Sequence, residues 1–170
     1  MLKTLIMAAT VAALPGAAVA QSEAAGRSCV SPEESRAVVA NLLPDILKQS
    51  AISCRAQIGE DNWLTRDGAS FAMDLEPLAD RAWPDAKRAL ERIAGNPLPD
   101  DPAMLAIGRS VIAAGIATNL DAGACDTVSR LTAELAPLPP ANFAGVFALF
   151  LELGIAENAD VPFRVCRAES

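Results

Sequence analysis

Four cysteines, all located beyond an N-terminal export signal, constrain this chain more than any other feature. Residues 1–20 carry Lys3, an apolar stretch over 5–14 and an Ala-x-Ala motif at 18–20, which is the order of a secretory signal peptide. An exported chain meets an oxidising environment, where an even number of cysteines favours disulfide bonds. We therefore predict that residues 1–20 are cleaved off and that residues 21–170 form one helical domain with two disulfides.

The alternative for residues 1–20 is a membrane anchor that stays attached. It is less favoured because the apolar stretch is shorter than the roughly 20 residues that a transmembrane helix needs. No cysteine follows the cleavage motif, so a lipid-anchored lipoprotein is not expected. The heavy use of alanine, and of arginine over lysine, is typical of a bacterium with GC-rich DNA. The expected location is therefore periplasmic or secreted, in a bacterium.

Charge and composition exclude some classes of partner. The chain has a net charge of −7, which becomes −8 when Lys3 leaves with the signal peptide. An acidic chain repels phosphate backbones and anionic lipids, so neither nucleic acid nor a membrane surface is an expected partner. The apolar residues are mainly alanine and leucine, which favour helices over sheets.

Apolar residues recur at helical spacing along the mature chain. Ser31 and Glu34 form a capping box before the first apolar stretch, and Gly95 followed by Pro97 marks a helix end. The fold class predicted is all-α, a single-domain bundle of about five helices. We expect them over residues 32–57, 77–95, 102–120, 126–136 and 140–157, with a short helix over 69–75.

Four further features of the bundle can be predicted from the pattern. Pro44 should kink or split the first helix. Residues 104–120 are apolar on almost every side, so this helix should be central and buried. Trp83 fits the core stripe of its helix. Trp63 lies in a polar loop over 59–68, and we expect it to fold back over the core.

The four cysteines allow three pairings. If consecutive helices alternate in direction, the two internal cysteines lie at one end of the bundle and the two terminal ones at the other. This topology predicts Cys54–Cys125 and Cys29–Cys166. The rival pairing joins Cys29 to Cys54 and Cys125 to Cys166. It requires a helix about 33 Å long to fold back at Pro44, because the Cα atoms of a disulfide lie within about 7 Å.

The sequence lacks the residues of several kinds of active site. It has no histidine, so no Ser-His-Asp triad, Cys-His pair or histidine metal ligand is available. The cysteines form no Cys-x-x-Cys motif. A calcium loop counted from Asp61 would place Arg66 where a glycine is required. We predict no metal site and no cofactor.

One carboxyl group is a candidate general acid. Glu152 lies between Leu151 and Leu153 on an apolar helix, and apolar surroundings raise the pKa of a carboxyl group. The simpler interpretation, which we prefer, is that Glu152 points to solvent or pairs with Arg109. Most helical glycosidases use a second carboxylate as well.

These observations support two hypotheses of different class. The first is a non-enzymatic binding or interaction module. It would carry an apolar small molecule between the helices predicted over 102–120 and 140–157, or bind a periplasmic protein through the Trp63 loop. The alternative is a histidine-free hydrolase of cell-wall glycan, with Glu152 or Glu60 as general acid.

Native mass spectrometry of the protein isolated from its own periplasm tests the export prediction. We expect a chain that begins at Gln21 and has no alkylatable thiol under non-reducing conditions, because the signal is cleaved and all four cysteines are oxidised. A chain that begins at Met1, or that carries four free thiols, would contradict it.

Overall fold

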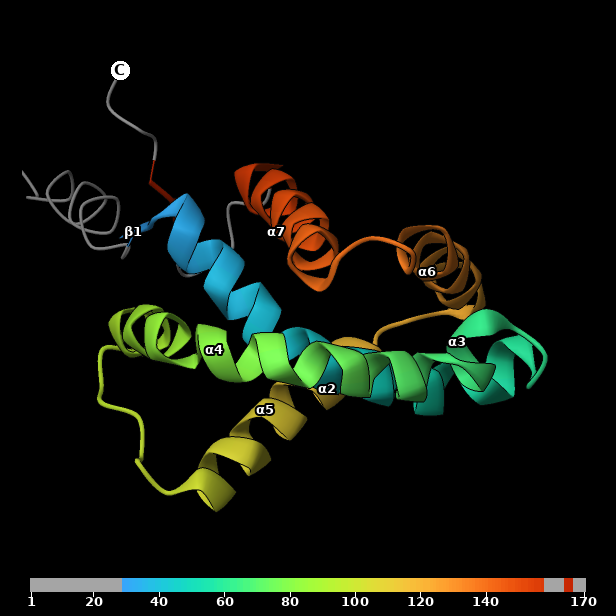
Figure 1. The fold of residues 1–170 in the computed structure, drawn as a ribbon, viewed down its shortest axis with the longest axis horizontal. Helices are drawn as coiled ribbons and strands as arrows, with labels where there is room; N and C mark the ends of the chain where they lie inside the picture. The colour runs from blue at the N-terminus through green and yellow to red at the C-terminus, as the bar shows by residue number, and fades with distance from the viewer. Residues whose placement is uncertain (1–28, 158–163, 167–170) are drawn as a thin grey trace, which may run out of the picture.

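A computed structural model describes residues 29–157 and 164–166. Residues 1–20, where a signal peptide is predicted, and most of the C-terminal tail lie outside these residues. The all-α class is confirmed, with one short parallel pair of strands besides the helices (Figure 1). The elements are β1 (Cys29–Val30), α2 (Pro32–Ile58), α3 (Trp63–Arg66), α4 (Gly68–Ala94), α5 (Pro102–Ala117), α6 (Ala122–Leu135), α7 (Pro140–Glu157) and β2 (Arg164–Val165).

Helix α2 begins at the predicted capping box. The Ser31 hydroxyl accepts a hydrogen bond from the Glu34 amide at 3.2 Å, and the Glu34 carboxylate accepts one from the Ser31 amide at 2.9 Å. The helix continues through Pro44 but changes direction along its length (Figure 1), as expected where a proline removes a helical hydrogen bond. It ends at Gly59, whose φ of +79° favours glycine.

Helix α4 is continuous, so the predicted break before Pro77 is wrong. Pro77 and Pro84 both lie inside the helix. Pro77 and Met73, whose carbonyl loses its helical partner, both face solvent, while Leu75 and Ala79 are buried. Water can bond the freed carbonyl on the exposed side, and the buried stripe continues past the proline.

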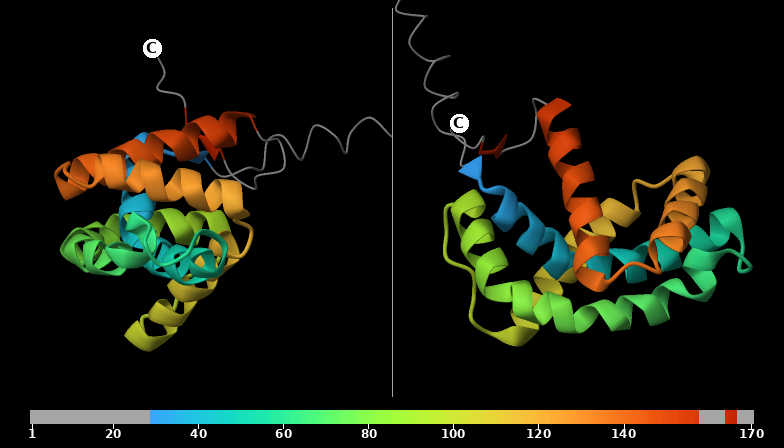
Figure 2. Two further views of the ribbon diagram at one scale, coloured as in Figure 1. Left: turned by 90° about the vertical axis from the view of Figure 1, so that its right-hand side faces the viewer. Right: turned by 45° about the horizontal axis from the view of Figure 1, so that its top comes forward.

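The core forms where α2 packs against α4 and α7. Leu43 and Leu47 of α2, Leu75 of α4 and Phe143 of α7 belong to one buried cluster. A series of ring contacts runs from α3 to α7, with centroid separations of 4.9–6.3 Å, through Trp63, Phe71, Phe143, Phe147 and Phe150. The views in Figure 2 show α7 and α4 on different sides of α2.

Two disulfides hold elements that are distant in sequence. Cys54 and Cys125 are both fully buried and join α2 to α6. Cys29 and Cys166 join the two ends of the described chain, beside the parallel pairing of β1 and β2. These are the pairs that the alternating-helix argument predicts, and the rival pairing is wrong because α2 does not fold back at Pro44.

Helix α5 is not the central helix that its composition predicts. Only Ala113 and Ala117 are buried, and it packs mainly against α2. Large apolar side chains elsewhere on α5 face solvent, with exposed fractions from 43 % at Ile112 to 65 % at Val111. The apolar pattern of α5 leaves it without a polar face. The contact between α5 and α2 is narrow, however, and only small side chains of α5 are buried in it.

Within the described residues, no single helix is long and apolar enough to cross a bilayer. Helices α5 and α6 taken together meet the length and composition but are bent by 117° at their junction.

The segment predicted as a polar loop over 59–68 contains the short helix α3. The Ser129 hydroxyl of α6 accepts a hydrogen bond from the buried Leu64 amide at 3.1 Å and donates one to Asn62 Oδ1 at 3.2 Å. Asn62 Oδ1 also accepts from the Thr65 amide, which caps α3. These bonds fix α3 to α6 and place Trp63, half-buried, at the edge of Phe71.

Removal of the buried disulfide should destabilise the fold strongly. In a Cys54→Ala/Cys125→Ala variant, loss of a cross-link spanning 71 residues should lower the free energy of unfolding by about 4 kcal/mol. Urea unfolding followed by circular dichroism measures this change. A loss below about 1 kcal/mol would show that packing alone holds α6.

The α2–α4 ion pair predicts a pH dependence of stability. Both Arg92 guanidinium Nη atoms donate to the Glu34 carboxylate at 2.7 Å, and this hydrogen bonding lowers the pKa of Glu34. A pKa lowered by folding stabilises the native state above the unfolded-state pKa of about 4.3, and this stabilisation is lost as the pH falls below that value. Glu34→Gln should therefore cost about 0.5 kcal/mol at pH 7 and almost nothing at pH 3.

Urea unfolding at both pH values tests this prediction. Glu134→Gln is the matched control, because Glu134 is exposed and makes none of the ion pairs seen among the described residues. An equal effect of Glu34→Gln on the free energy of unfolding at the two pH values would show that the Glu34–Arg92 ion pair does not make stability depend on pH.

Candidate functional site

An apolar groove lies between the C-terminal half of α4 and helix α5. It has a volume of about 330 Å³, within the range of small-molecule sites in proteins. We call it the α4–α5 groove. Its main lining residues are Trp83, Leu90 and Ile93 of α4, Met104, Leu105 and Ile112 of α5, and Leu42 of α2.

The connection between α4 and α5 sets the width of the groove. Helix α4 ends at Gly95, whose φ of +69° is left-handed. The Leu98 amide then donates to the Glu91 carboxylate at 2.9 Å, which holds the connection against α4. Asp101 caps α5 by accepting from the Ala103 amide at 2.8 Å. Helix α5 therefore starts at a fixed point away from α4 and runs back toward α2 (Figure 1).

Large apolar side chains of α5 are exposed both inside and outside the groove. Met104 and Ile112 line the groove, while Ile107 and Val111 lie on the solvent side of the same helix. Apolar side chains exposed together on one element mark ligand or partner sites more often than isolated ones do. Gly108 lies among them, and a Cβ atom built on it meets nothing within 4 Å. The groove is thus open at this position.

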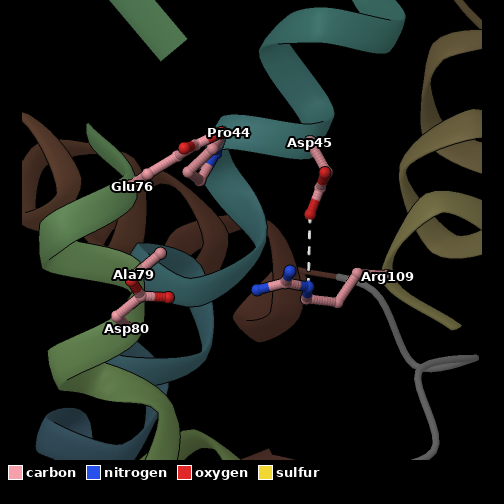
Figure 3. Close-up of a pocket in the computed structure, with 6 residues that line it drawn as sticks. All are labelled: Pro44, Asp45, Glu76, Ala79, Asp80 and Arg109. Carbon is pink, nitrogen blue, oxygen red and sulfur yellow. Dashed lines mark ion pairs between the residues drawn. The ribbon is translucent and has the colours of Figure 1, made fainter. Parts of the chain in front are cut away.

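A charged residue, Arg109, lies at one end of the groove. Figure 3 shows its guanidinium beside Asp45 of α2, with an Nε–Oδ2 distance of 3.3 Å. Although Nε is buried, it makes no hydrogen bond that meets geometric criteria within the described part of the chain. Arg109 also lines a polar pocket of about 180 Å³ with Asp45, Glu76 and Asp80. Arg109 therefore lines both the apolar groove and the acidic pocket.

A third pocket, of about 270 Å³, shares lining residues with both the groove and the polar pocket. Its lining includes Asp80, Trp83, Asp100 and Arg109. Asp100 forms an ion pair with Lys87, and the hydrogen bond from Lys87 lowers the pKa of Asp100 while raising the pKa of Lys87. Asp100, in the connection between α4 and α5, is thus paired with Lys87 of α4, whereas Asp80 of the same pocket takes part in none of the ion pairs among the described residues.

The structure does not gather the sequence-predicted acids around this groove. Glu152 is half-buried on α7 and Glu60 is exposed after α2, and neither lines the groove or the two adjoining pockets. The suggested Glu152–Arg109 pair is wrong, because Arg109 pairs with Asp45. Among the described residues, no cluster of three cysteine, aspartate or glutamate side chains could hold a metal ion.

The sequence predicts the position of the groove only in part. It predicts an apolar cavity between the helices over 102–120 and 140–157, whereas the groove lies between α4 and α5. Trp83, predicted as a core residue, is half-buried and lines the groove. The one sequence signal that could have indicated this site is the composition of α5, which is too apolar for a helix with a single packing partner.

Comparison with models of known protein families, with curated proteins and with solved structures found no match to this chain. The arrangement of the groove suits the binding of an apolar chain or ring, with polar groups at one end that orient the ligand.

Proposed function

We propose that this chain is an exported, non-enzymatic binding module that holds an apolar small molecule in the α4–α5 groove. The observation that carries the proposal is the groove itself, with Trp83 on one wall and Met104 and Ile112 on the other. Burial of apolar surface by a ligand gains about 25 cal/mol per Å². A ligand would thus cover part of the apolar surface that the fold leaves in water.

The export half of the proposal is supported by two features. Residues 1–20 have the order of a cleavable signal peptide. The four cysteines form two disulfides, and disulfides persist in oxidising compartments such as the bacterial periplasm.

Two glycines of α5 offer a matched test of the groove. Gly108 lines the groove, whereas Gly115, two turns later, does not. Both are exposed, and a Cβ atom at either meets nothing within 4 Å. Replacement of either by leucine improves helix propensity by roughly the same amount. Only Gly108→Leu, however, places a side chain in the groove.

We expect the neutral apolar dye N-phenyl-1-naphthylamine to bind the wild-type protein saturably at one site, with enhanced dye fluorescence. Gly108→Leu should weaken this binding at least about tenfold, because the new side chain occupies the ligand's volume, while Gly115→Leu should leave it unchanged. The absence of saturable binding, or equal losses in the two variants, would overturn the proposal.

A further inference from the structure

The charges around the end of the α4–α5 groove at which Arg109 lies are not balanced. Asp45 pairs with Arg109, Glu76 with Lys48, and Asp100 with Lys87. Asp80 is the remaining carboxylate of the two adjoining pockets. It takes part in none of the ion pairs found among the described residues. The excess charge at this end of the groove is therefore negative, because four carboxylates face the three cations Arg109, Lys48 and Lys87.

Asp80 lies next to an aromatic side chain of the groove. Asp80 and Trp83 are three residues apart on α4, so they share one face of the helix. Both line the pocket of about 270 Å³, which shares Trp83, Leu105 and Arg109 with the groove. A ligand that fills the groove thus passes Trp83 and ends beside Asp80.

The Asp80 carboxylate and the Trp83 indole ring together distinguish a cationic from an anionic head group of a ligand. A carboxylate and an indole ring together favour a cation, since the ring contributes a cation–π interaction and the carboxylate an ion pair. An anionic head group would meet Asp80 unfavourably, and the one cation available in the groove lining, Arg109, already pairs with Asp45. An anion would have to compete with Asp45 for Arg109.

We infer that the ligand is a cationic amphiphile, with its apolar chain in the α4–α5 groove and its ammonium group between Asp80 and Trp83. The inference rests on the proposed function, because it names the chemical class of the ligand at the same site.

Three compounds with the same decyl chain test the head group. Decyltrimethylammonium is cationic, decyl maltoside is neutral and decyl sulfate is anionic. Isothermal titration calorimetry, at concentrations where the compounds are monomeric, measures their affinities for the full mature protein. We expect the cation to bind about tenfold tighter than the neutral compound. The anion should bind most weakly of the three.

The matched variants are Asp80→Asn and Asp74→Asn. Both remove one negative charge from α4, and both positions are exposed, but Asp74 lines none of the three pockets. Asp80→Asn should weaken binding of the cation about three- to fivefold and leave binding of the maltoside unchanged. Asp74→Asn should change neither.

The outcomes separate the two proposals. If the maltoside binds as tightly as the cation, or if the two variants behave alike, the cationic head group is refuted while the apolar groove stands. If none of the three compounds binds, or if Gly108→Leu does not weaken their binding, the proposed function fails as well.

Discussion

The packing of α2 against α4 is the contact on which the rest of the structure depends. Alanines form much of the buried face of α4, and such small side chains let two helices approach closely. The Asn41 side-chain amide of α2 crosses this interface and donates to the Ala79 carbonyl at 3.1 Å. Near one end of the interface, the Glu34–Arg92 ion pair joins the same two helices. Every other helix is then placed on a face of α2 or α4 that remains free.

The position of α5 follows from this arrangement. Helix α2 already contacts α4 and α7, and the buried Cys54–Cys125 disulfide ties it to α6. What it offers α5 is a narrow contact filled by Ala113 and Ala117, with the Asp45–Arg109 ion pair beside it. The contact is made by alanines on one face of α5. The large apolar side chains on the other faces of α5 therefore lie outside the contact. They line the groove or face solvent. The narrow contact between α2 and α5 is therefore the reason that an apolar candidate binding site is exposed.

Local signals in the sequence predicted local structure well. The capping box at Ser31 and the glycine stop at Gly95 lie where the sequence predicts them, because each depends on atoms within a few residues. The prolines predicted helix ends less well. Pro77 lies inside α4 on its solvent side, where the loss of one helical hydrogen bond does not end the helix. The partner of Arg109 could not be predicted, because an ion pair between helices depends on how they are rotated and shifted against each other.

The sequence by itself determined that the chain is helical and where most of its helices begin and end. These properties depend on propensity, capping and chain length, which act along the chain. Only the tertiary structure decided which apolar faces are covered. A hydrophobic pattern shows which side chains gain from leaving water, but it does not name the neighbour that covers them. The groove exists because α5 is apolar all round and α2 can cover only one side of it.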